Sequence, residues 1–172
     1  MTDQASVDRL AEELQGQAID LLINNAGILP RVDSVTTLDI DVFRRVLEVN
    51  TTGPVRVTQA LLPHVRRGSG QKIINITSQL GSIGNNSGGR YYGYRESKAA
   101  LNMFTRSLAA ELRADGIICV VLHPGWVQTD MGGPNASLRP SESVAGMRKV
   151  IAGLASSDSG TFRTHAGQEM PW

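Results

Sequence analysis

The amino-acid sequence predicts an α/β fold, a partial Rossmann-like doubly wound parallel sheet. Short apolar runs at 19–23, 72–76 and 117–122 predict strands, and longer segments between them have helical periodicity. Near-continuous apolarity in strands is typical of a parallel sheet that helices cover on both faces. Because 172 residues is the length of one domain, we expect residues 1–172 to form a single domain.

The spacing of apolar residues predicts five helices, at residues 6–14, 39–50, 55–65, 94–114 and 141–154. Asp39 is the expected N-cap of the second helix, and Thr52-Gly53-Pro54 is expected to interrupt the chain between the second and third helices. Asp115-Gly116 ends the fourth and strongest helix. A weak last strand is expected near Gly167 to Met170.

Composition excludes several classes of protein. The chain has 17 Lys and Arg against 16 Asp and Glu, a balance without the basic footprint of a dedicated nucleic-acid binder. Its apolar runs fall far short of the ~20 residues of a membrane helix, and no secretory signal opens it. The single cysteine, Cys119, excludes an internal disulfide and a multi-cysteine metal site. We expect a cytoplasmic protein that binds neither nucleic acid nor membranes.

Three polar or glycine-containing segments directly follow predicted strands. They are Asn24 to Gly27, Ser78 to Gly81 and Pro124 to Thr129. In open parallel sheets, ligands bind beyond the carboxyl ends of the strands. The sequence therefore predicts a binding site where these three segments meet, although each taken alone is also ordinary turn chemistry.

Tyr94 and Lys98 are four residues apart at the start of the strongest helix, so their side chains share one face. An ammonium group near a phenol lowers the phenol's pKa from ~10, and a tyrosine with a lowered pKa can act as a general acid or base. Tyr92 has Glu96 at the same spacing, which has the opposite effect on a phenol. Tyr91 has Arg95, which does not exchange its proton as a lysine does.

Other reactive side chains have simpler interpretations. Ser78 has no Gly-x-Ser-x-Gly elbow around it, so a serine nucleophile is a weaker reading than a hydroxyl that donates to a substrate. His64, His123 and His165 have no metal-ligand spacing, and Cys119 lies inside an apolar strand. We therefore expect no metal site.

In combination, these motifs resemble the short-chain dehydrogenase/reductase family and follow one another in the family's order. They are the NNAG turn at 24–27, the asparagine Asn50, the serine Ser78, the YxxxK pair Tyr94 and Lys98, and the PGxxxT segment at 124–129. The resemblance extends from about Asp3 to Trp172. The loop at 81–86 and the terminal Pro171-Trp172 are similar to the C-factor-type branch of the family.

The resemblance implies an oxidoreductase that transfers a hydride between NAD or NADP and a small carbonyl or alcohol substrate. It implies that Tyr94 transfers a proton, Lys98 lowers the pKa of Tyr94 and holds the nicotinamide ribose, Ser78 polarises the substrate, and Asn50 holds a water linked to Lys98. It places the cofactor against Asn25, Ala26, Gly27, Tyr94, Lys98, Pro124, Gly125, Val127 and Thr129. The alternative is a non-enzymatic interaction or signalling module that retains these motifs.

The sequence departs from the family in one respect. The glycine-rich TGxxxGxG turn, which binds the cofactor pyrophosphate at a helix N-terminus, does not occur before Asn24. We therefore expect a family fold without its first half-Rossmann unit, so that the choice between NAD and NADP stays open. Residues 1–172 alone should bind the cofactor weakly, and the strand at 19–23 should have an open edge that favours a homo-oligomer.

Overall fold

The computed structural model describes residues 1–172, and its core is a parallel sheet of four strands in the order β1-β2-β3-β4. The strands are β1 (Leu21–Asn24), β2 (Lys72–Ile76), β3 (Ile118–His123) and β4 (Phe162–Thr164). All three neighbouring pairs are parallel, with Ile74 opposite Ile23 on one side and Val120 on the other. The predicted α/β class is confirmed.

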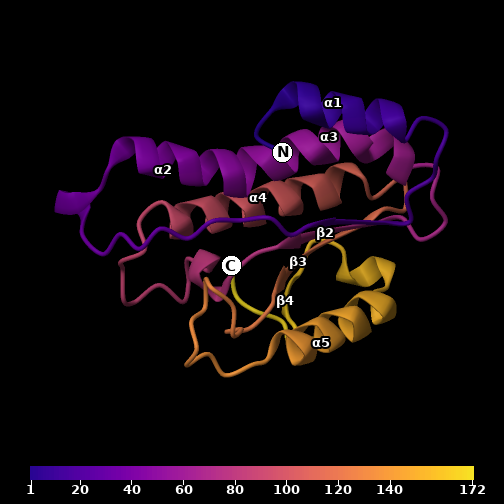
Figure 1. Ribbon diagram of the computed structural model, residues 1–172. Helices are drawn as coiled ribbons and strands as arrows, with labels where there is room; N and C mark the ends of the chain where they lie inside the picture. Colours follow the sequence, from indigo (N-terminus) through magenta and orange to yellow (C-terminus); the bar gives the residue numbers. More distant parts are fainter.

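Five helices cover the sheet. They are α1 (Gln4–Glu13), α2 (Ile40–Leu47), α3 (Gly53–Val65), α4 (Tyr94–Glu111) and α5 (Pro140–Gly153). Figure 1 shows α1 to α4 on one side of the sheet and α5 on the other. None of these helices combines the length and the apolar character needed to cross a bilayer.

Alternation of side chains along the strands divides the core into two layers. Ile73 and Cys119 point toward α3 and α4 and pack with Leu61 and Leu108. Ile74, Ile76, Val120 and Leu122 point the other way and pack with Ile151 of α5. The central strands are thus buried on both faces.

The expected interruption at Thr52-Gly53-Pro54 is wrong, because the chain stays helical there. A π-helical turn, Glu48–Thr52, joins α2 directly to α3, and Pro54 lies in the first turn of α3. Proline has no N–H to donate, and the wider π turn accommodates this loss without breaking the helix. Asn50 lies inside this turn and is fully buried.

The expected strand at Gly167 to Met170 is also wrong. The last strand of the sheet is β4, and the chain then reverses at Gly167, whose φ of +87° suits glycine. The returning segment runs antiparallel to β4, with Met170 N–H donating to Phe162 O at 2.8 Å.

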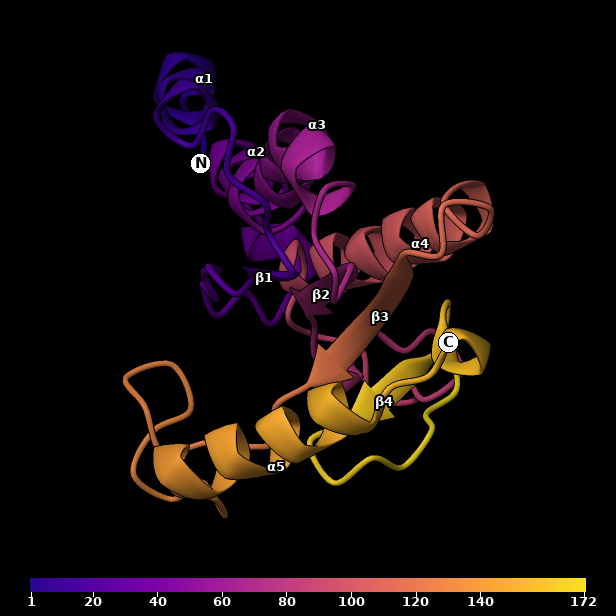
Figure 2. The same cartoon turned by 90° about the vertical axis from the view of Figure 1, so that its right-hand side faces the viewer.

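The open edge predicted beside residues 19–23 is confirmed. Strand β1 pairs only with β2, so its outer edge has no partner within the chain. Leu21 and Ile23 are 39% and 44% exposed. Leu21 and Ile23 lie on the face of the sheet that α5 covers further along. Figure 2 shows α5 alongside β4, away from β1, so α5 does not cover these two side chains.

Candidate active site

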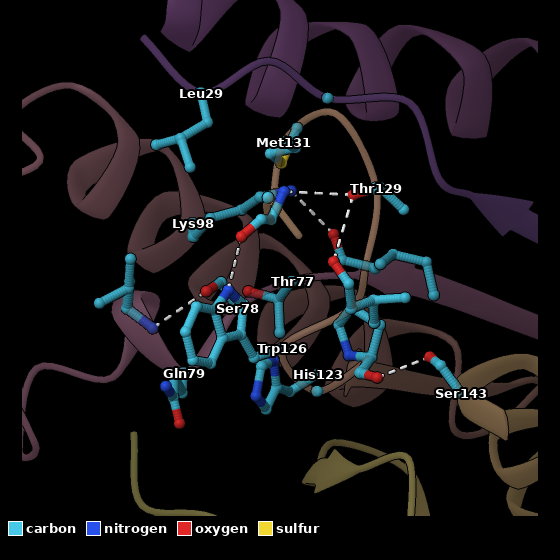
Figure 3. Close-up of a pocket in the computed structure, with 18 of the residues that line it drawn as sticks. Leu29, Thr77, Ser78, Gln79, Lys98, His123, Trp126, Thr129, Met131 and Ser143 are labelled. Carbon is cyan, nitrogen blue, oxygen red and sulfur yellow. Dashed lines mark hydrogen bonds between the residues drawn. The ribbon is translucent and has the colours of Figure 1, made fainter. Parts of the chain in front are cut away.

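A cavity of about 1240 Å³ lies at the carboxyl ends of the strands, where the sequence predicts a site. Its walls contain every predicted site residue except Asn50: Asn25, Ala26, Gly27, Ser78, Tyr94, Lys98, Pro124, Gly125, Val127 and Thr129. Asn50 lies behind the wall and acts on it through hydrogen bonds. Figure 3 shows Lys98, Ser78, Trp126 and Thr129 around this cavity.

Tyr94 is the first residue of α4, and the local sequence sets its position. The preceding residue, Gly93, has a φ of +81°, and its N–H donates to Glu96 Oε2 at 2.6 Å, which caps the helix. Tyr94 is 6% exposed. Burial raises the pKa of Tyr94, and a hydrogen bond with Ser78 lowers it by less. The phenol is therefore protonated at neutral pH.

Lys98 lies one turn further along α4, with 4% of its surface exposed. Its Nζ donates to Ile76 O at 2.9 Å and lies 5.8 Å from the centre of the Tyr94 ring. Burial lowers the pKa of Lys98 to about 8. Desolvation dominates at the phenol, so the pKa of Tyr94 is raised in the chain alone, and the expected effect of Lys98 on that pKa stays a prediction.

Asn50 ties the turn after β1 to the first turn of α4. Its side chain accepts from Ile28 N–H at 2.8 Å and donates to Ile28 O at 2.9 Å. It also donates to Ser97 Oγ at 3.0 Å, and Ser97 in turn donates to Tyr94 O. The turn after β1 packs closely against Asn50. A Cβ at Gly27 would lie 3.3 Å from Asn50 Oδ1, so there is little room for a side chain at this position.

Ser78 follows β2 by two residues and begins a short 3-10 turn, Gln79–Gly81. Its Oγ accepts from Leu80 N–H at 3.1 Å, which directs the hydroxyl group within the turn. The turn is held against α4, because Asn102 accepts from Thr77 Oγ1 at 2.6 Å and donates to Gly81 O at 3.2 Å. Ser78 and Tyr94 thus reach the same cavity from a strand end and a helix start.

The opposite wall follows β3. Gly125 has a φ of +85°, a conformation that favours glycine, and a Cβ there would lie 2.4 Å from the mobile tip of Leu138 and 3.1 Å from His165 Nδ1. Ser143 of α5 donates to Pro124 O at 2.6 Å and fixes the turn, as the dashed line in Figure 3 shows. Trp126, half exposed at the rim, donates from Nε1 to Gly132 O at 2.8 Å.

Sequence reasoning missed the buried polar residues that support this site. Asn24 donates to Thr58 Oγ1 and to Asn75 Oδ1, and Asn75 donates to Thr105 Oγ1, which forms one chain across the core. An asparagine inside a predicted strand, as at Asn75, was the available signal, since a buried polar group needs a partner. No three His, Cys, Asp or Glu side chains lie close enough together to hold a metal ion.

The family of the chain follows from comparison with known proteins. The family model described as short chain dehydrogenase matches residues 1–139, which include Asn50, Ser78 and the Tyr94–Lys98 pair. The chain belongs to the short-chain dehydrogenase family. As a member, it is an oxidoreductase that uses a nicotinamide cofactor.

Proteins of two bacteria are among its relatives. The chain is 47% identical to the C-signal of Myxococcus xanthus, over 90% of this chain and 93% of that protein. It is 37% identical to the 1-hydroxy-2-glutathionyl-2-methyl-3-butene dehydrogenase of Rhodococcus sp. (strain AD45), over 100% of this chain and 77% of that enzyme. The similarity to C-signal agrees with the predicted C-factor-type branch.

Two solved carbonyl reductase structures have the same fold as the chain. The carbonyl reductase Sniffer of D. melanogaster matches with a TM-score of 0.95 and 35% identity, over 99% of this chain and 75% of that one. The NADPH-bound carbonyl reductase from chicken fatty liver matches with a TM-score of 0.90 and 40% identity, over 99% of this chain and 74% of that one.

Proposed function

We propose that the chain interconverts a carbonyl compound and its alcohol, with Tyr94 as the proton donor in the direction of reduction. The observation that carries this proposal is the meeting of Tyr94, Lys98 and Ser78 at one cavity from two different elements. A general acid must lie within hydrogen-bond reach of the atom that it protonates. A carbonyl oxygen between the Tyr94 and Ser78 hydroxyl groups meets this condition.

The raised pKa of Tyr94 suits reduction, because the phenol keeps its proton until negative charge develops on the substrate oxygen. Ser78 then donates a hydrogen bond to the same oxygen and holds the carbonyl in place. The Lys98 ammonium, 5.8 Å from the phenol ring, stabilises the phenolate that remains. With a pKa of about 8, Lys98 can also return a proton near neutral pH. The nicotinamide, when bound, supplies or accepts the hydride.

The dimensions of the cavity fit a nicotinamide cofactor together with a substrate. Its volume of about 1240 Å³ exceeds the ~300–1,000 Å³ of an ordinary small-molecule pocket. We assign Asn25 to Gly27 to the adenosine side of the cofactor and Pro124 to Thr129 to its nicotinamide side. A Cβ at Gly27 would crowd Asn50 and Lys98, and one at Gly125 would crowd Leu138 and His165, so glycine lets both turns pack closely against the residues behind them. NADPH is the first cofactor to test, because the chicken carbonyl reductase binds it.

We assign Asn50 to positioning, because its amide bonds Ile28 and Ser97 and so fixes the turn after β1 relative to α4. The rim of the cavity suggests an apolar substrate. Trp126, Met131 and Val144 line it with 52%, 40% and 49% of their surfaces exposed. Exposed apolar side chains around a cavity mark a surface that binds apolar ligands.

A second candidate function is signalling through interaction with another protein. Its support is the 47% identity to C-signal, which extends over 93% of that protein. This candidate does not require the hydroxyl group of Tyr94 to take part in chemistry. Removal of the Tyr94 hydroxyl oxygen should therefore abolish the proposed reaction and leave a signalling function intact.

The test is steady-state oxidation of NADPH and NADH with a panel of apolar aldehydes and ketones. We expect turnover by the wild type and a loss of about 10²–10⁴-fold in Tyr94→Phe, the range of one general acid. Tyr92→Phe, two residues earlier and outside α4, is the matched control and keeps wild-type activity. A folded wild type without turnover, or a fully active Tyr94→Phe, excludes the proposed reaction.

A further inference from the structure

Pro171 and Trp172 have no part in the chemistry proposed above, yet they lie beside the loop that follows Ser78. After the reversal at Gly167, the chain returns along β4 and places Trp172 against this loop, as the end of the chain in Figure 1 shows. The amide N–H of Gly84, six residues after Ser78, donates to Trp172 O at 2.8 Å. A Cβ at Gly84 would lie only 3.3 Å from the same oxygen.

The indole ring of Trp172 is held on two further sides. It lies 5.7 Å from the ring of Phe162, a fully buried residue of β4. The guanidinium of Arg106, on α4, lies 5.5 Å from the indole centre and makes a cation–π contact. Arg106 is itself fixed, because it donates to Gly160 O at 2.9 Å. Trp172 therefore joins β4, α4 and the loop after Ser78.

Helix α4 already holds the start of this loop at two other places. Arg95 donates to Leu80 O at 3.3 Å, and Asn102 donates to Gly81 O at 3.2 Å. Arg95, Asn102 and Arg106 follow one another at intervals of seven and four residues, which places them on one face of the helix. The same helix begins with Tyr94. One face of α4 thus sets the position of the Ser78 loop, in part through Trp172.

We propose that Trp172 is a positioning residue for catalysis, which holds the loop from Ser78 to Gly84 so that the Ser78 hydroxyl reaches the same substrate oxygen as Tyr94. This inference rests on the proposed function. The bond from Gly84 goes to a backbone oxygen, which any residue at 172 possesses, so the ring is what determines where that oxygen lies. Small misplacements of a catalytic group cost large factors in rate.

The experiment compares Trp172→Ala with Trp172→Phe in the full chain. In Trp172→Ala we expect kcat to fall about 10-fold, with the Kd for NADPH, measured by its fluorescence, unchanged within 2-fold. Amide hydrogen exchange at Gly84 should become at least about 10-fold faster. Trp172→Phe keeps an aromatic ring against Phe162 and Arg106 and should restore both quantities to near wild type.

Val7→Ala is the control for a general loss of stability, because Val7 is buried in α1, away from this loop. It should lower the melting temperature and leave kcat and Gly84 exchange unchanged. The proposal is overturned if Trp172→Ala keeps the wild-type kcat, if its Gly84 exchange is unchanged, or if Val7→Ala reproduces both effects. If the wild type itself has no turnover, the proposed function fails, and unchanged Gly84 exchange separately overturns the loop contact.

Discussion

Two sides of the same sheet differ in how well their residues are buried and hydrogen-bonded. Where α4 meets the ends of β2 and β3, Tyr94, Lys98 and Ser78 are all more than 90% buried, and hydrogen bonds hold them in place. We call this region the catalytic corner. At the opposite side, β1 has no partner on its outer edge, and Ile23 is 44% exposed.

This difference shows that the proposed catalytic geometry depends on few elements. The start of α4 and the end of β2 place the reacting groups, and Asn50 connects the start of α4 to the turn after β1. Binding of the adenosine side of the cofactor, and any oligomerisation, should depend instead on the β1 side of the sheet. Variants in the two regions should therefore change different measured quantities.

Lys98→Met should have the largest effect, because it removes the cation of the catalytic corner. We expect a loss of activity of at least about 100-fold and a gain in stability. A pKa lowered from 10.5 to about 8 means that folding with a charged Lys98 costs about 3 kcal/mol at pH 7. Loss of the bond to Ile76 O offsets about 1 kcal/mol, which leaves a net gain of about 2 kcal/mol.

Urea unfolding measures this gain in stability. The cost of the charged lysine is present below pH 8 and disappears as the pH rises from 8 to 10.5, so the two stability curves should approach and then cross in that window, because the lost bond to Ile76 O remains. Lys72→Met, at the more exposed start of β2, is the control and should change stability little. A Lys98→Met protein less stable than wild type at pH 7 would contradict the assigned cost of burial.

His123 should make the fold sensitive to acid. Burial, and secondarily the nearby His165, lower the pKa of His123 to about 4 from 6.5. Its contribution to stability is complete above pH 6.5 and is lost as the pH falls toward 4, by about 3 kcal/mol. His123→Asn should remove this part of the pH dependence. Parallel stability curves for the two proteins between pH 4 and 6.5 would refute the burial of a neutral imidazole.

Gly27→Ala should weaken binding of the cofactor by about 10-fold, or roughly 1.4 kcal/mol. The added methyl would lie 3.3 Å from Asn50 Oδ1 and 3.5 Å from Lys98 Nζ, so the turn must move. Gly153→Ala is the matched control, because a Cβ there meets nothing within 4 Å. Fluorescence titration with NADPH measures the Kd of both variants. Equal Kd values would show that the turn at Gly27 is not part of the cofactor site.

Ile23→Lys should have the smallest effect on stability, within about 0.5 kcal/mol, because the side chain is already half exposed. We still predict a homo-oligomer through the open edge, and a charge on an edge strand opposes such pairing. Light scattering after size exclusion should show a smaller species for Ile23→Lys. Leu10→Lys, equally exposed on α1, should leave the wild-type size unchanged. A monomeric wild type would contradict the edge interaction.

The sequence predicted β1, β2 and β3 but not β4, and it predicted which segments line the cavity, because these features depend on local patterns. Buried strands need apolar runs, and the turns after them need glycine or asparagine, as at Gly27 and Gly125. The π turn around Asn50 was not predictable, because no local pattern separates it from a helix break before Pro54. The raised pKa of Tyr94 in the chain alone was not predictable for a related reason, since spacing reveals a neighbouring Lys98 but does not reveal burial.

The tail of the chain shows the same limit. Residues 167–170 have the composition of a weak strand, and they do form a single bridge between Arg163 and Glu169, but antiparallel to β4. The proposed role of Trp172 depends on where the returning segment places the indole ring. That position is set by tertiary contacts with Phe162, across the chain reversal, and with Arg106, which lies far away in sequence on α4.

Single-turnover oxidation of NADPH by residues 1–172, with a saturating carbonyl substrate, tests most directly whether the catalytic corner is sufficient for the reaction. We predict a rate that saturates with NADPH, a Kd weaker than about 0.1 mM, and a saturated rate at least about 100-fold lower in Tyr94→Phe. The absence of any saturable oxidation by the folded wild type, or an equal rate in Tyr94→Phe, would contradict it.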